Sequence, residues 1–223
     1  MMTTRALHQL LDDSASRFPD NVAVEETETG SISYAELARL SDRVRDHLLQ
    51  LRVGPGDRVG ICMRKSADAV ASIFGIMKTG AAYVPADPTA SATRNAFIFH
   101  DCAVKVLIVE ARQAEALRLA FSQVAFAPKW LSSIGPELES RSPTLSTGWT
   151  PSAASSVPSA VPESSQLANI LYTSGSTGRP TVSCCRTVTV KAFTSTRAIE
   201  LKKFCSENLP LYLQWNIANR RSL

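Results

Sequence analysis

The segment YTSGSTGRP, residues 172–180, combines glycine with hydroxyl side chains directly after a short apolar run. Glycine tolerates positive φ angles, so consecutive backbone N–H groups in such a loop can point into one concavity. Thr173, Ser174, Ser176 and Thr177 would add hydroxyl donors. A concavity of this kind suits a polyphosphate, although neither G-x-x-x-x-G-K-[ST] nor G-x-G-x-x-G is present. The residue types alone therefore leave two alternatives open, an anion-binding loop and a flexible linker.

The cysteines and histidines predict no second site. The five cysteines are odd in number and form no C-x-x-C pair, so we expect reduced thiols that serve mainly in packing. The histidines form no H-E-x-x-H pattern, and we therefore expect no metal site and assign no catalytic residue. The residues concerned are Cys62, Cys102, Cys184, Cys185 and Cys205, with His8, His47 and His100.

Alternating apolar runs and helical patterns predict the fold class. The runs RVGICM, AAYVPAD, KVLIVE and LANILY are typical of buried strands, and NVAVEE and SIS of shorter ones. An amphipathic helix is expected to end at Pro19, and Ser33 with Glu36 forms a capping-box pattern before the next helix. Further helices are expected over about residues 66–78, 92–102 and 111–121. Strands that alternate with such helices favour the α/β class, a parallel sheet flanked by helices.

Composition and charge bound the class of protein. The chain has 223 residues, of which 44% are hydrophobic and 20% charged, as in ordinary globular proteins. It contains neither a membrane-length apolar run nor a signal-peptide core, so we expect a soluble, cytoplasmic protein with no membrane contact. The basic character of the chain, with a net charge of +4, belongs to scattered residues from 182 onward. We interpret this segment as a solvated basic end and expect no nucleic-acid partner.

Several stretches resemble one protein family, in the same order and at similar spacing. YTSGSTGRP closely resembles the signature phosphate loop of the adenylate-forming superfamily, the AMP-dependent synthetases and ligases that include adenylation domains of nonribosomal peptide synthetases. ISYAEL at 32–37 and MKTGAAYVPADP at 77–88 are similar to core motifs of its amino-acid-activating branch. RNAFIFHDCAVKVLIV at 94–109 is similar to the segment that follows them. The resemblance covers about residues 5–180.

This resemblance implies a two-step reaction. A carboxylate attacks the α-phosphate of Mg-ATP to give an acyl-adenylate and pyrophosphate, and a thiol, usually a phosphopantetheine arm, then takes the acyl group. It implies ATP and Mg2+ as cofactors and a carrier protein or synthetase module as partner. The family's loop holds the β- and γ-phosphates, an electrostatic task that fixed N–H and hydroxyl donors perform well. Carried over residue by residue, this role falls on Thr173, Ser174, Gly175, Ser176, Thr177 and Gly178.

The chain departs from the family pattern after the loop. Lysine and glycine follow R-P in the family, whereas this chain has Thr181 and Val182, and Thr181 brings no positive charge to a phosphate. The family's acceptor pocket, adenine-binding and ribose-binding motifs, hinge and catalytic lysine do not follow, while ELKKFCSENLPLY at 200–212 resembles part of the C-terminal subdomain. An internal deletion, a splice variant, a degraded gene and an incorrect gene model stay open as origins.

We therefore predict a partial, incomplete N-terminal subdomain of the adenylate-forming ligase fold, a truncated relative that does not complete catalysis by itself. Two alternatives are a noncatalytic interaction module, which binds a synthetase or carrier protein through an uncovered sheet edge, and one part of a split ligase. The predicted organisation is an N-terminal α/β part at 1–131, a Ser/Pro-rich connector at 132–166, a strand and phosphate loop at 167–181, and a basic tail with the C-terminal remnant at 182–223.

Overall fold

The computed structural model describes residues 6–26, 30–133, 167–174 and 180–186. The elements in chain order are α1 (Leu7–Arg17), β1 (Val22–Glu26), β2 (Gly30–Ser33), α2 (Tyr34–Gln50), β3 (Arg58–Cys62), α3 (Ala67–Lys78), β4 (Ala82–Pro85), α4 (Ala92–Asp101), β5 (Val106–Glu110), α5 (Ala111–Gln123), β6 (Lys129–Ser133), β7 (Leu167–Ser174) and β8 (Pro180–Arg186).

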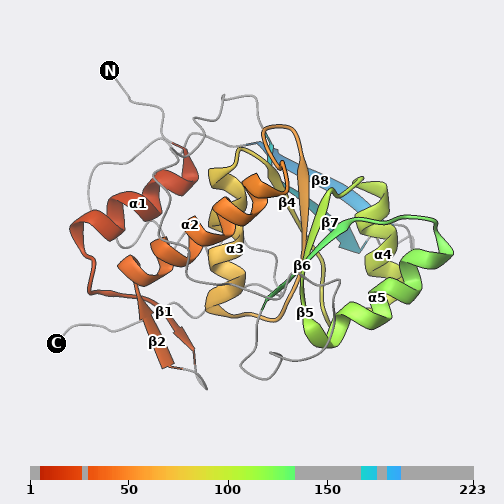
Figure 1. Cartoon of the computed structure of the whole chain (residues 1–223), viewed down its shortest axis with the longest axis horizontal. Coiled ribbons are helices and arrows are strands. Elements are labelled where there is room, and N and C mark those ends of the chain that lie inside the picture. Colours follow the sequence, from red (N-terminus) through yellow and green to blue (C-terminus); the bar gives the residue numbers. More distant parts are fainter. Residues whose placement is uncertain (1–5, 27–29, 134–166, 175–179, 187–223) are drawn as a thin grey trace.

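A single sheet joins six of the described strands, in the order β6-β5-β3-β4-β7-β8 (Figure 1). Its first five strands run parallel to one another, and β8 runs antiparallel to β7. Strands β1 and β2 form a separate antiparallel pair. The predicted α/β class with a parallel sheet is therefore confirmed.

Helices cover both faces of this sheet. Figure 1 shows α1, α2 and α3 on one side of the sheet and α4 and α5 on the other. Strand β5, which lies between β6 and β3, consequently has apolar side chains on both faces, as is typical of a parallel strand covered on both faces. Val106 and Ile108 join the apolar cluster beneath α1 to α3, whereas Leu107 and Val109 join the cluster beneath α4 and α5.

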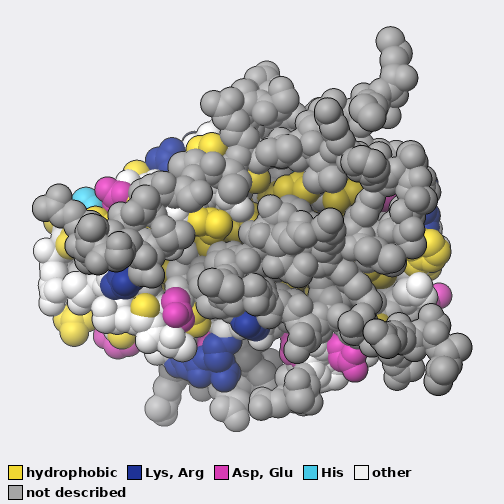
Figure 2. Space-filling view, turned by 180° about the vertical axis from the view of Figure 1, so that it is seen from behind, with side chains coloured by type: hydrophobic (Ala, Val, Ile, Leu, Met, Phe, Trp, Pro, Cys, Tyr) yellow, Lys and Arg dark blue, Asp and Glu magenta, His cyan; other side chains and the backbone are white. Residues whose placement is uncertain are grey.

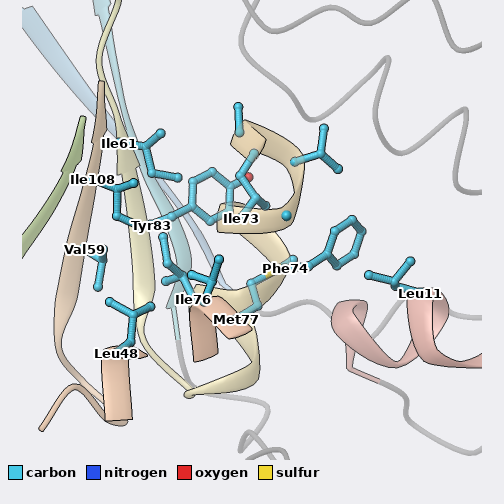
Figure 3. Packing of buried hydrophobic residues seen from close by; sticks show 14 of the residues in the cluster. Leu11, Leu48, Val59, Ile61, Ile73, Phe74, Ile76, Met77, Tyr83 and Ile108 are labelled. Atoms are coloured by element: carbon cyan, nitrogen blue, oxygen red, sulfur yellow. The ribbon is translucent and has the colours of Figure 1, made fainter. Parts of the chain in front are cut away.

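Helix α3 forms the middle of the first cluster. Figure 3 shows Ile73 and Ile76 directed toward the sheet, while Phe74 points toward Leu11 of α1. The other side of α3 lies so close to α2 that a Cβ atom at Gly75 would be 2.5 Å from the Val44 Cβ. The same atom would be 2.8 Å from a backbone carbonyl oxygen of α2. Glycine is therefore required at position 75 for this approach of the two helices.

Local capping explains where two of the helices begin. The Ser33 Oγ accepts a hydrogen bond from the Glu36 backbone N–H at 3.3 Å, and the Glu36 carboxylate accepts one from the Ser33 N–H at 2.8 Å. The predicted capping box is thus confirmed. Ser66 caps α3 in a similar way, since its Oγ accepts from the Ala69 N–H at 3.2 Å. Both caps satisfy backbone donors that a helix start leaves without partners.

A buried ionic network joins the three helices of the first layer. The Lys78 ammonium at the end of α3 lies 2.6 Å from the Asp12 carboxylate of α1 and 2.8 Å from the Asp42 carboxylate of α2. Asp42 is also 3.0 Å from the guanidinium of Arg45, which pairs in turn with Asp46 at 2.8 Å. Because the Lys78 side chain is only 1% exposed, its charge depends on these carboxylates for solvation.

Beside this network, His8 makes stability sensitive to pH. Burial lowers the pKa of His8 below 6.5, the Asp12 charge opposes this shift, and the Lys78 charge adds to it. The unfolded chain therefore takes up a proton at a pH where the folded chain does not, and stability falls as the pH drops below about 6.5.

We expect the urea midpoint of wild type to decrease between pH 7 and pH 5 by more than that of His8→Gln. The difference between the two chains isolates His8, because every other titratable group is common to both. Equal pH dependence in the two chains would contradict a buried neutral histidine.

Two predicted domain boundaries fall inside strands. Residues 132–133, assigned to the connector, belong to β6, and residues 182–186, assigned to the tail, belong to β8. The rest of the predicted connector and tail, including the stretch that resembles the C-terminal subdomain, lies outside the described residues. The four-part organisation stays a prediction.

The described surface mixes charges of both signs. Figure 2 shows basic side chains beside acidic ones among the coloured residues of the face opposite to that of Figure 1. No described helix combines the length and the apolar character that spanning a membrane requires.

Candidate functional site

The candidate site begins at the end of β7, where the structure describes only part of the predicted loop. Thr173 and Ser174 are the last two residues of β7, and residues 175–179 lie outside the described residues. Strand β8 then returns along β7, with Thr181 opposite Thr173 and Pro180 opposite Ser174. Of the six residues predicted to bind phosphate, Thr173 and Ser174 therefore end β7, and the other four lie outside the described residues.

The position of this hairpin in the sheet suits a ligand site. Strand β7 runs parallel to β4, and the two pair at Asn169 and Tyr83. The end of β7 consequently lies at the same edge of the sheet as the carboxyl ends of β3, β4 and β5. In open α/β sheets, ligands bind outside this edge.

Hydrogen bonds of Asn169 and Tyr172 join side chains of β7 to the rest of the domain. The Asn169 Nδ2 donates to the Tyr83 hydroxyl at 2.9 Å in the buried middle of the sheet. Nearer the loop, the Tyr172 hydroxyl donates to the Asp101 carboxylate at the end of α4. Burial raises the pKa of Tyr172, and the bond to Asp101 raises it further. The phenol therefore remains protonated and keeps its role as donor.

A polar cluster lies where β3 and β4 end. The Asn95 Nδ2 of α4 donates to the Asp87 carbonyl oxygen at 2.8 Å and lies 3.6 Å from the Cys62 Sγ. Burial raises the pKa of the Cys62 thiol to about 12, with the Glu110 charge acting in the same direction. Cys62 is therefore a neutral thiol that packs in the core, and it does not act as a nucleophile near neutral pH.

The neighbouring strand ends are fixed by Glu110, the last residue of β5. Its carboxylate accepts a hydrogen bond from the Arg64 backbone N–H, just beyond β3, and lies 2.7 Å from the Arg112 guanidinium. The Glu110 carboxylate therefore links the segment after β3 to the start of α5. Within the described ranges, no group of three or more His, Cys, Asp or Glu residues could hold a metal ion.

The sequence indicated the loop, which stays a prediction, but not the side chains that join β7 to α4. Tyr172 was part of the recognised motif without a role of its own, and Asp101 lay in a resembling stretch without being singled out. The two side chains are 71 residues apart in sequence, and no local periodicity relates them. The motif YTSGSTG and the end of a helix were the only signals near either residue.

Comparison with known proteins places this geometry in a family. Residues 11–182 match the model of the AMP-binding enzyme family. Malpinin synthetase of Mortierella alpina is 37% identical over 175 residues, which are 78% of this chain and 2% of the synthetase. Nonribosomal peptide synthetase atnA of Emericella nidulans is 38% identical over 107 residues, which are 48% of this chain and 2% of that protein.

A solved structure agrees with these relatives. The inhibitor-bound N-terminal domain of FACL13 from Mycobacterium tuberculosis superposes with a TM-score of 0.69 and 26% identity, over 82% of this chain and 44% of that one. The chain thus belongs to the AMP-binding enzymes, the adenylate-forming ligases, and is related to the adenylation domains of nonribosomal peptide synthetases. It spans only a small part of these synthetases.

Proposed function

We propose that the chain carries the phosphate-binding part of an ATP-dependent ligase that adenylates a carboxylate, most simply an amino acid. The observation that carries this proposal is the position of the described start of the glycine and hydroxyl segment. Thr173 and Ser174 end β7 at the carboxyl edge of a parallel sheet, in a chain that belongs to the AMP-binding enzymes. The similarity to peptide synthetases supports an amino acid as the acid, and a carrier-bound thiol in the cytoplasm as the acceptor.

In this proposal the loop stabilises the leaving group. A carboxylate oxygen forms a bond to the α-phosphorus of ATP, the bond from that phosphorus to the β-phosphate oxygen breaks, and the electron pair leaves with pyrophosphate. Backbone N–H groups and hydroxyls from Thr173 to Gly178 would hold the β- and γ-phosphates, and Mg2+, brought in with ATP, would supply further neutralisation of charge. Fixed donors suit this task because they need no reorganisation as the charge develops.

We further propose that these 223 residues bind ATP weakly and do not complete the reaction alone. The charged side chains described near the strand ends are engaged in structural contacts, as Glu110 is with Arg64 and Arg112. The chain also corresponds to less than half of the solved relative. Isotope exchange between pyrophosphate and ATP, run with a panel of amino acids, tests this statement. Amino-acid-dependent exchange by the purified chain would contradict it.

The Thr181→Lys variant tests the phosphate site itself. Position 181 lies opposite Thr173 at the base of the loop, so a lysine there places a positive charge close to bound phosphates. We expect the Kd for Mg-ATP, measured by equilibrium dialysis, to fall about fivefold, the effect of one partly screened charge.

Gln123→Lys is the matched control for this variant. Gln123 is exposed at the end of α5, just before β6 begins, and therefore lies toward the opposite edge of the sheet. Gln123→Lys adds the same charge as Thr181→Lys and should leave the affinity for Mg-ATP almost unchanged. An equal decrease of the Kd for Mg-ATP in both variants would indicate non-specific attraction between ATP and the added positive charge.

The same assays separate the two alternatives. Absence of ATP binding by the chain and by Thr181→Lys would contradict the phosphate site and favour a noncatalytic module that binds a synthetase or carrier protein. Binding without exchange, followed by exchange when a separately expressed C-terminal part of a related ligase is added, would favour a split ligase.

A further inference from the structure

In the part of the chain that the structure describes, little backbone pairing joins β7 to the parallel strands. Within the described residues, β7 pairs with β4 only at Asn169, while its pairing with β8 continues to Ser174. Backbone hydrogen bonds to β8 do not by themselves fix the end of β7 against the rest of the domain, because β8 is the outermost described strand and pairs, among the described strands, with β7 alone. Side-chain contacts of β7 beyond Asn169 therefore contribute to holding its end in place.

Tyr172 joins β7 to the end of α4. Its hydroxyl donates to the carboxylate of Asp101, the last residue of α4, and accepts from the Cys102 thiol at 3.7 Å. Its ring packs against the apolar cluster beneath α4 and α5. A hydrogen bond to a charged acceptor is about twice as strong as one between neutral groups. This contact lies two residues before Ser174, where β7 ends.

We propose that Tyr172 is a positioning residue, whose hydrogen bond to Asp101 fixes the end of β7 against α4 and thereby holds Thr173 and Ser174 at the carboxyl edge of the sheet. The proposal deepens the phosphate-binding function proposed above and rests on it for the role in binding. The geometric part, that the contact holds the end of β7, stands apart from any ligand. Two measurements address these parts separately.

The first measurement is hydrogen–deuterium exchange of the peptide spanning residues 170–182, without ligand. We expect amides of this peptide to exchange at least about tenfold faster in Tyr172→Phe and in Asp101→Ala, because a hydrogen bond to a charged group is lost. Asp101→Asn keeps an oxygen acceptor and should fall between wild type and Asp101→Ala. The double variant Tyr172→Phe/Asp101→Ala should exchange no faster than either single variant, since both remove one interaction.

Tyr34→Phe is the control for loss of a tyrosine hydroxyl. Tyr34 begins α2 on the other side of the sheet, so this variant should leave exchange of the 170–182 peptide unchanged. Unchanged exchange in Tyr172→Phe and Asp101→Ala would overturn the proposal. So would equal acceleration in peptides throughout the chain, because that result describes general destabilisation.

The second measurement is the Kd for inorganic tripolyphosphate, a probe that carries phosphates without adenosine. We expect at least about tenfold weaker binding by Tyr172→Phe and Asp101→Ala, partial recovery in Asp101→Asn and wild-type affinity in Tyr34→Phe. Wild-type affinity in the first two variants would overturn the role in binding. Failure of the wild-type chain to bind the probe would instead count against the proposed function, while hydrogen exchange would still decide whether the contact holds the end of β7.

Discussion

Replacing Phe99 with alanine is expected to lower the free energy of unfolding by about 3–5 kcal/mol, the range found when a fully buried aromatic ring is removed. Phe99 of α4 is completely buried, and its ring lies 6.5 Å from that of Phe121 of α5, measured between centroids. The ring also covers Gly60 of β3, where a Cβ atom would be 2.8 Å from it. Because Gly60 has no side chain to fill the space, alanine at position 99 would leave a cavity above the centre of the sheet.

Phe97, two residues earlier on the same helix, provides the control. Its side chain is 50% exposed, so Phe97→Ala removes the same atoms from a site where water already reaches the ring. We expect a loss below about 1 kcal/mol in urea unfolding, as for most surface substitutions. Similar losses in the two variants would contradict the packing of α4 on β3 described above.

The sequence predicted those elements whose periodicity is long and strongly apolar. Helices α3 and α4 were expected to within one residue of their observed ends, because each carries apolar residues at helical spacing over ten or more residues and begins at a serine cap. Strand β5 was expected because its four apolar residues, from Val106 to Val109, are all buried. In these segments local pattern and tertiary environment favour the same structure.

Strands β6 and β8 were missed for a physical reason. Each lies at an edge of the sheet and has one neighbouring strand among the described residues, so pairing with that neighbour decides its conformation. Strand β8 begins at Pro180, which lacks an N–H donor and gave no signal for a strand. Its pairing with β7 is a contact between two strands, which no pattern within residues 180–186 indicates.

The parts of the candidate site also differ in how far the sequence predicted them. The loop was indicated by the resemblance of a short segment to a family motif, whereas the Tyr172–Asp101 contact depends on how α4 packs beside β7. The same holds for Lys78, which lies within the recognised stretch MKTGAAYVPADP and had no partner assigned. Its two carboxylates come from other helices, and sequence separation hides such contacts from any local pattern.

Lys78→Ala is expected to cost about 3 kcal/mol of the free energy of unfolding, because removing one partner of a buried ion pair leaves charge without compensation. The Asp12 and Asp42 side chains are 42% and 29% exposed, which places the expected loss at the lower end for buried pairs. Urea unfolding at neutral pH measures this loss of unfolding free energy. Lys78→Met retains most of the volume of the aliphatic chain and should recover only the part of the loss that is due to packing.

Lys105→Ala is the matched control, because the Lys105 ammonium lies 2.8 Å from the Asp57 carboxylate, the same separation as between Lys78 and Asp42. Its side chain is 36% exposed, however, and the loss should stay below about 1 kcal/mol, as for surface ion pairs. Added salt should reduce the small effect at Lys105 more than the larger one at Lys78, since buried pairs are screened less. If Lys78→Met were as stable as wild type, the network would serve only to fill space between α1, α2 and α3, and the charge of Lys78 would contribute nothing to their packing.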